Sequence, residues 1–137
     1  MDSTAHKTIV RSLFDQVLNR GRLQIIDECF AEEFVEHNPA PGQGPGREGV
    51  KHRVCTLREA FPDLRFVVDE IVAENEIVAV RYRWEATHSG TYLGIQATGR
   101  RVAVRGMDFY RFKNGCVVEH WDNMDELSML TQLGDLG

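Results

Sequence analysis

Apolar residues recur at intervals of three and four over the first third of the chain, which is the spacing of one face of an α-helix. The pattern predicts a first helix that ends at about Asn19, a short second helix, and a third helix over residues 47–60. Ser3 and Thr4 are the expected caps of the first helix. Pro62 follows the third helix, where a proline ring stops helical structure. The N-terminal part of the chain is therefore predicted to be helical.

After Pro62 apolar and polar residues alternate, which is the period of β-strands. The alternation predicts four long strands, over residues 64–73, 77–88, 101–112 and 116–122. A short strand is expected near Tyr92, and a last helix over residues 125–133 would bury Leu127. Helices followed by meandering strands indicate one α+β domain spanning residues 1–137. A curved antiparallel β-sheet wrapped around the N-terminal helices would form a cone-shaped pocket for a small molecule.

The composition narrows the possible functions. The chain has 137 residues, of which 42% are hydrophobic, a mean hydropathy of -0.33 and a formal net charge of -5. Basic residues are dispersed, which argues against a nucleic acid partner. Apolar runs are far shorter than the ~20 residues that span a bilayer, and the N-terminus lacks the apolar core of a signal peptide. Three scattered cysteines without a CxxC pair predict no disulfide framework and favour a cytoplasmic protein.

The most informative polar cluster lies at the end of the last predicted strand. Strict alternation places Val118, His120 and Asp122 on one face and Trp121 on the other, and does not settle which face points inward. The Asn-Gly turn before this strand predicts a hairpin that brings Asp108 opposite Asp122. Asp122 is a candidate general acid/base, because a sheltered carboxylate can transfer protons. The alternative is a solvated strand end paired with an arginine. His120 could position a substrate or hold a proton.

Other polar residues have two interpretations each. His37 and Asn38 precede the Gly/Pro-rich loop of residues 39–46, the one candidate for a lid, and either reach the pocket or lie on the surface. His88 either donates a hydrogen bond at the pocket rim or ends its strand. Asp125 stands directly before a helix, where capping is the preferred interpretation.

Several chemistries lack their motifs. The chain has no HExxH sequence and no histidine pair at ligand spacing, so no metal site is predicted. It has no GxSxG sequence, and Cys116 precedes valines like a core residue. An aromatic lining for a flat polycyclic or terpenoid ligand is available. Its candidates are Phe14, Phe34, Tyr82, Trp84, Tyr92, Phe109, Tyr110 and Trp121.

Four segments carry a resemblance to a known family. They are FVEHNPAPGQGPGREGVK, REAFPDLRFVVDEIVAENEIVAVRYRWEATHSG, ATGRRVAVRGMDFYRF and NGCVVEHWDNMDELSMLTQLG. With them the chain resembles the SnoaL-like polyketide cyclases, a branch of the nuclear-transport-factor-2-like cone fold, from the first helix to Gly134. The resemblance implies cofactor-free closure of a ring in a polyketide ester by intramolecular aldol condensation. An aspartate takes a proton alpha to a carbonyl, and the enolate attacks a second carbonyl.

The resemblance also implies roles for single residues. The EHWD segment places the aspartate at Asp122, and His37, His88 and His120 fall where the family has polar pocket groups. Asp108 stands where some cyclases carry a histidine, and a second carboxylate near Asp122 could raise the pKa of one of the two.

Competing functions remain open at this point. An isomerase could use the same cone, and an epoxide hydrolase would need Asp108, Asp122 and either Arg83 or Arg105 together in the pocket. A non-catalytic binding or assembly module is the third possibility. The resemblance implies pairing through the open sheet face, into a homodimer or a homotetramer.

Overall fold

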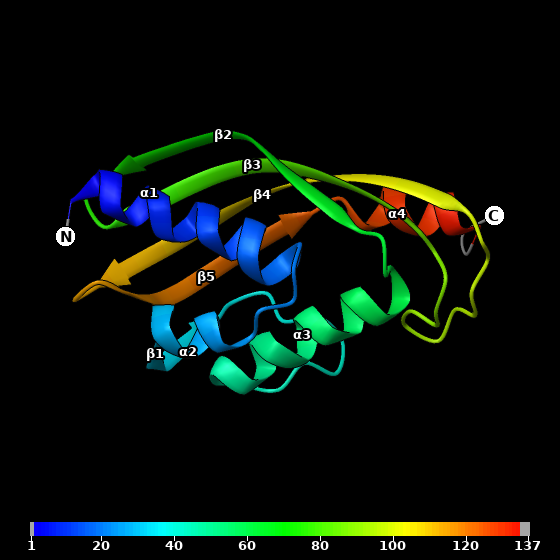
Figure 1. The fold of residues 1–137 in the computed structure, drawn as a ribbon, viewed down its shortest axis with the longest axis horizontal. Helices are drawn as coiled ribbons and strands as arrows, with labels where there is room; N and C mark the ends of the chain where they lie inside the picture. The colour runs from blue at the N-terminus through cyan, green and yellow to red at the C-terminus, as the bar shows by residue number, and fades with distance from the viewer. Residues whose placement is uncertain (1, 135–137) are drawn as a thin grey trace.

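One curved five-stranded sheet carries the whole fold. The computed structural model describes residues 2–134. The helical segments are α1 (Ser3–Ser12), the π-helical η1 (Leu13–Leu18), α2 (Gln24–Cys29), α3 (Gly46–Ala60) and α4 (Glu126–Leu133). The strands are β1 (Phe30–Glu36), β2 (Arg65–Glu74), β3 (Ile77–Thr87), β4 (Arg101–Lys113) and β5 (Cys116–Met124). The α1 helix packs against β2 and β3, α3 against β1, and α4 against β4 (Figure 1). The α+β architecture predicted from the sequence is confirmed.

The sheet is mixed rather than wholly antiparallel. Its strand order is β1-β5-β4-β3-β2, and the four strands from β2 to β5 pair antiparallel, as predicted. The edge strand β1 joins β5 in parallel, which the sequence interpretation did not foresee. No hairpin links β1 to β5, since α3 and three strands lie between them in the chain, so turn geometry does not fix their relative direction.

Alternation along β3 and β4 builds the floor of the core. Every second residue of these strands is buried, and helix residues spaced by three and four cover them. The buried set includes Val10, Phe14, Val17, Val78, Val80, Trp84, Val102, Val104 and Phe112. This face forms an apolar floor on the inner side of the curved sheet.

A β-bulge in β5 changes the predicted facing of that strand. Arg111 pairs with Glu119 while the next residue, Phe112, pairs with Val117, so Val118 is the extra residue. Val117 is fully buried, and His120 lies on the same side of the sheet. The strict alternation that grouped Val118 with His120 was therefore wrong for the first half of the strand.

Smaller differences concern the ends of elements. Asp2 rather than Ser3 caps α1, through a hydrogen bond from the Ala5 amide to the Asp2 carboxylate. The segment around Tyr92 makes one isolated bridge to Ile95 instead of a strand. Leu127 is 69% exposed, because α4 buries Met129 and Leu133, which are one turn apart and share its inner face.

Candidate active site

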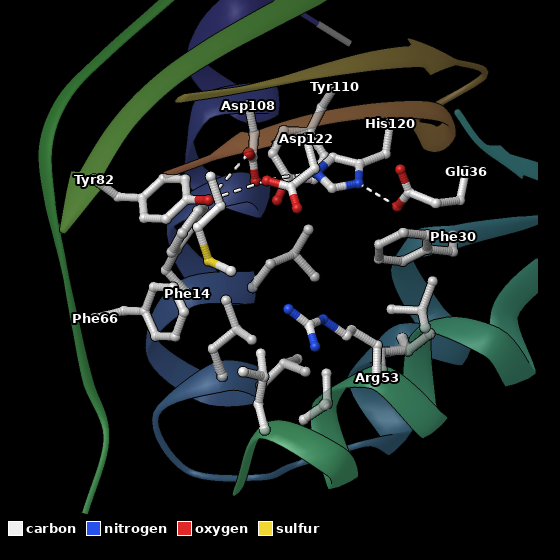
Figure 2. Close-up of a pocket in the computed structure, with 18 of the residues that line it drawn as sticks. Phe14, Phe30, Glu36, Arg53, Phe66, Tyr82, Asp108, Tyr110, His120 and Asp122 are labelled. Carbon is white, nitrogen blue, oxygen red and sulfur yellow. Dashed lines mark hydrogen bonds and ion pairs between the residues drawn. The ribbon is translucent and has the colours of Figure 1, made fainter. Parts of the chain in front are cut away.

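A cavity lies between the helices and the inner face of the sheet. It contains about 700 Å³ of space free of protein atoms, part of it open to solvent. Most of its wall is apolar and comes from η1, α2 and α3, whereas its acidic groups, its histidine and its tyrosines come from β1, β3, β4 and β5 (Figure 2). Arg53 on α3 and Gln43 in the loop before it are its other polar residues. The lining includes Leu13, Phe14, Val17, Ile26, Phe30, Val50, Val54, Leu57, Phe66, Tyr82, Tyr110 and Met124.

Two carboxylates face each other across β4 and β5 at one end of the cavity. Asp108 and Asp122 are direct register partners, as the hairpin predicted. The Tyr82 hydroxyl, on β3, lies 3.1 Å from Asp122 Oδ1 and 3.3 Å from Asp108 Oδ1, so it can donate to either. The Tyr82 ring packs against Phe14, with ring centroids 5.1 Å apart. The pair is thus held in a mostly apolar environment.

His120 is fixed between two carboxylates. Its Nε2 lies 3.0 Å from Asp108 Oδ2 and its Nδ1 lies 2.5 Å from Glu36 Oε1. Burial opposes charge on the imidazole, but the hydrogen bonds and charges of Asp108 and Glu36 outweigh it and raise the pKa of His120 to about 10. At neutral pH the ring is therefore an imidazolium that donates to both acids.

The two aspartates have opposite pKa shifts. Burial raises the pKa of Asp108, but hydrogen bonding to His120 and the imidazolium charge outweigh it, so the pKa of Asp108 lies below its usual value. Burial and then the negative charge of Asp108 raise the pKa of Asp122 to about 8. The sequence indicated that either Asp108 or Asp122 could have a raised pKa, and in the structure this residue is Asp122. A pair of acids with separated pKa values is typical of acid–base sites.

Six of the residues selected from the sequence line the cavity together. They are Phe14, Tyr82, Asp108, Tyr110, His120 and Asp122. Figure 2 shows the two aspartates, His120 and Tyr82 gathered on one side of the cavity. The Tyr110 ring packs on the imidazole of His120, with centroids 4.5 Å apart.

His37 and Trp121 do not line the cavity, contrary to the sequence prediction. Their rings stack on each other, with centroids 4.5 Å apart, and His37 Nε2 lies 3.2 Å from Glu119. Neighbours in an extended strand point to opposite faces. Because Glu36 and His120 point inward, His37 and Trp121 point outward. Asn38 supports the strand end instead, since its side-chain oxygen accepts a hydrogen bond from the Asp122 amide at 3.0 Å.

Three more predicted binding residues are buried away from the cavity lining. Trp84 is fully buried, and its indole N–H points at the Met124 sulfur at 3.3 Å. His88 is fully buried and its Nδ1 contacts Thr98, so it anchors the loop after β3 instead of lying at the pocket rim. Phe34 packs edge-on against Phe30, which is the ring that reaches the cavity.

The arginines proposed for an Asp–Arg–Asp arrangement lie outside the cavity. Arg105 is exposed on the outer face of β4, since its neighbours in the strand point inward. Arg83 is also on the outer face and pairs with Asp69 at 3.1 Å. The predicted combination of either arginine with the two aspartates is therefore wrong. Phe109 points outward as well and is 51% exposed.

Sequence reasoning missed two charged residues of the cavity. Glu36 follows the buried Phe34 by two positions in β1, so alternation from Phe34 was a usable signal for its inward direction. Arg53 lies on α3 one residue before the buried Val54. Its neighbours on the helix are mostly apolar, and the sequence pattern alone gave no reason to place it at the cavity.

Two further findings concern metals and membranes. Within residues 2–134 no group of histidine, cysteine, aspartate and glutamate side chains is arranged to hold a metal ion. No helix in the same range has the length and apolarity needed to cross a bilayer.

Comparisons with known proteins show the family of the chain. The aklanonic acid methyl ester cyclase DauD of Streptomyces sp. (strain C5) is 27% identical over 126 residues, which cover 88% of this chain and 76% of DauD. TsrD from Streptomyces laurentii superposes with a TM-score of 0.89 at 28% identity, over 98% of both chains. AclR from Streptomyces galilaeus, a candidate hydroxylase, has a TM-score of 0.85 at 30% identity, over 98% of this chain and 83% of AclR. The sequence profile of the SnoaL-like polyketide cyclases matches residues 8–133, and the chain belongs to that family.

Proposed function

We propose that this protein closes a ring in a polyketide-like, hydrophobic polycyclic substrate by a cofactor-independent aldol reaction, with Asp122 as the general acid/base. The observation that carries the proposal is the position of Asp122, in a mostly apolar cavity beside Asp108, where its pKa rises to about 8. A carboxylate of raised pKa is a stronger base than an ordinary aspartate. General acid–base catalysis works best when that pKa is close to the operating pH.

The reaction would proceed in three proton-balanced steps. Ionised Asp122 takes a proton from the carbon alpha to a carbonyl, and the C–H electron pair moves into the enolate. The enolate carbon attacks a second carbonyl carbon of the same molecule, so that a C–C bond forms and the carbonyl π bond becomes an alkoxide. Protonated Asp122 then returns its proton to the alkoxide. The product has the same mass as the substrate, and Asp122 ends in its starting state.

The neighbouring groups would tune this base. Asp108 keeps the pKa of Asp122 high by its negative charge, and His120 keeps Asp108 ionised. Glu36 fixes the imidazole from its other nitrogen. Tyr82, whose pKa is raised first by burial and then by the two aspartates, stays protonated and can donate a hydrogen bond to an oxygen that develops charge. We regard Asp108 and His120 as positioning residues and Asp122 as the catalytic residue.

Substitution of Asp122 by asparagine tests the proposal directly. With aklanonic acid methyl ester and its free acid as the first assay substrates, Asp122→Asn should lower turnover by about two orders of magnitude or more, the scale of general acid–base catalysis. Substrate binding should survive, because the two side chains have the same shape. Product of unchanged mass is followed by liquid chromatography and mass spectrometry. Asp69→Asn, which neutralises an aspartate on the outer face, is the matched control. If Asp122→Asn turns over at the wild-type rate with any accepted polyketide substrate, the residue has no acid–base role.

An isomerase is the second candidate, favoured by the same pair of aspartates with separated pKa values. It would move a double bond through the enolate without forming a C–C bond, and carbon NMR of the product separates the two reactions. An epoxide hydrolase would incorporate oxygen from labelled water, which ring closure does not. A non-catalytic binding module would bind polycyclic ligands without turnover in either the wild type or Asp122→Asn.

We further propose that two copies of the chain pair through the outer face of the sheet. Met107 and Phe109 are exposed at 59% and 51% on neighbouring outward positions of β4, with Trp121 beside Phe109 on β5. Large exposed apolar groups that adjoin one another favour a protein partner over water. A cytoplasmic location is proposed on the basis of Cys29, Cys55 and Cys116, which are all free.

A further inference from the structure

Arg53 brings a positive charge to the wall of the cavity opposite the acids. It lies on α3, and Figure 2 shows its guanidinium extending into the cavity from the side opposite Asp122 and His120. Its Nη1 donates to the Tyr92 hydroxyl at 2.7 Å, and the guanidinium carbon lies 5.6 Å from the centre of the Tyr92 ring. Tyr92 is fully buried, so it holds one edge of the guanidinium in place.

The charge of Arg53 has no acidic partner within residues 2–134. The acids of the cavity are engaged elsewhere: Glu36 and Asp108 both bind His120, and Asp122 interacts with Tyr82. The wall around Arg53 is formed by aliphatic side chains, including Val50, Val54 and Leu57. Arg53 is half-buried, so its guanidinium loses part of its hydration without gaining a counter-ion, and a ligand that supplies a negative charge would offset that loss.

The two sides of the cavity therefore differ in charge. Below about pH 8 Asp122 is mostly neutral, so the acid side holds the negative Glu36 and Asp108 and the positive His120. Its net charge is negative and would repel an anionic ligand group. The α3 side stays positive, because a guanidinium does not lose its proton in proteins.

We propose that Arg53 binds a carboxylate of the substrate. The inference rests on the proposed function in one respect, namely that this cavity is the substrate site. A guanidinium offers parallel N–H groups that fit the two oxygens of a carboxylate. With the carboxylate held on the α3 side, the opposite end of a flat apolar ligand lies at Asp122. Arg53 thus determines both which substrate is accepted and which carbon meets the base.

The test compares one ligand with and without its negative charge. Anthraquinone-2-carboxylate and its methyl ester are titrated into the protein at pH 7, and the dissociation constants are measured by calorimetry. The wild type should bind the carboxylate at least tenfold more tightly than the ester. Arg53→Gln should bring the two constants within about twofold, mainly by weakening carboxylate binding. Arg53→Lys should retain part of the preference, because it keeps the charge and loses the paired geometry.

Controls separate this inference from general damage and from the proposed function. Arg11→Gln removes an exposed arginine from α1 and should leave the preference unchanged. Tyr92→Phe should reduce it, since Arg53 loses its anchoring hydrogen bond. Equal affinity of the wild type for both ligands, failure of both to bind, or an Arg53→Gln variant that keeps the preference would overturn the inference. If Arg53→Gln does not fold, the wild-type and Arg53→Lys constants decide it. Turnover of Asp122→Asn is judged separately, so loss of one conclusion leaves the other standing.

Discussion

A carboxyl group with a pKa near 8 is available to chemistry in both of its protonation states. At pH 7 about one-tenth of Asp122 is ionised, and that fraction is a far stronger base than an exposed aspartate. Burial disfavours the ionised form of Asp122, and this makes the carboxylate a stronger base. Asp108 raises the pKa further only because His120 keeps it negative. In the proposed mechanism Asp122 is the acid/base, and Asp108 and His120 set its pKa.

The pH dependence of catalysis follows from these shifts. If ionised Asp122 is the base, kcat/KM should rise with pH up to about 8, where the free protein loses that proton. It should fall again above about 10, where His120 loses a proton and can no longer donate hydrogen bonds to both Glu36 and Asp108. Initial rates between pH 5 and pH 11 measure the profile. A rate that instead falls as pH passes 8 would mean that protonated Asp122 starts the reaction.

The Asp108→Asn variant tests whether Asp108 sets the pKa of Asp122 or takes part in the reaction itself. It removes the negative charge beside Asp122, so the rising limb of the profile should move to lower pH while activity is retained. A rise still centred at about pH 8 would show that Asp108 does not set the pKa of Asp122.

The raised pKa of Asp122 also affects the free energy of unfolding. In the unfolded chain Asp122 ionises near 3.8, whereas in the folded protein it keeps its proton to about pH 8. The free energy of unfolding therefore falls between these pH values and its loss is complete above them. Asp122→Asn does not titrate, so it should be more stable than the wild type at pH 9, by at least about 1 kcal/mol or roughly 3 °C in Tm. The two proteins should be closest near pH 4. Thermal unfolding at both pH values measures the difference, and equal Tm values at pH 9 would contradict the raised pKa.

At the scale of elements, the sequence predicted what depends on neighbours in the chain. The Asn-Gly turn fixed the β4–β5 hairpin, so the encounter of Asp108 with Asp122 could be predicted. The bulge at Val118 could not, because one extra residue leaves no trace in an apolar stretch. Nor could the contact of Glu36 with His120, since β1 and β5 lie 84 residues apart at this point and no local rule sets their pairing. Because neither the bulge nor the pairing of β1 with β5 was predicted, His37 and Trp121 were assigned to the wrong face of the sheet.

The pairing of β3 with β4 contains a position where only glycine fits. Gly106 is the register partner of Tyr82, and a methyl group there would overlap the Tyr82 hydroxyl and ring. Gly106→Ala should displace the tyrosine from Asp122, lower kcat by about tenfold, and destabilise the fold by about 1–3 kcal/mol, the range for overpacking. Gly44→Ala, where the added methyl meets open space, is the control. Rates and urea denaturation measure both effects, and an unchanged kcat in Gly106→Ala would show that the position of Tyr82 does not matter.

At the scale of the whole molecule, the curved sheet separates the two proposed functions, catalysis and pairing. Its inner face carries the cavity, and its outer face presents Met107, Phe109 and Trp121. Alternation along β4 supplies residues to both faces, because Asp108 points inward between the outward-pointing Met107 and Phe109. A substitution on one face changes the other only if it moves the strand itself.

Pairing of two copies can be tested from the outer face alone. Phe109→Glu should convert the proposed dimer to a monomer, since it places a charge in the apolar contact. Light scattering after size-exclusion chromatography measures the mass. Leu93→Glu alters an exposed apolar residue in the loop between β3 and β4 and should leave the mass unchanged. A wild type that is already monomeric would refute the pairing.

The edge position of β1 has a consequence for how the protein acquires its activity. Glu36 reaches His120 only after segments from the two halves of the chain have met, which is a late and slow step for contacts so distant in sequence. Until then the imidazole lacks one of the two acids that hold its proton. We therefore expect Asp122 to reach its full basicity only after β1 has joined β5.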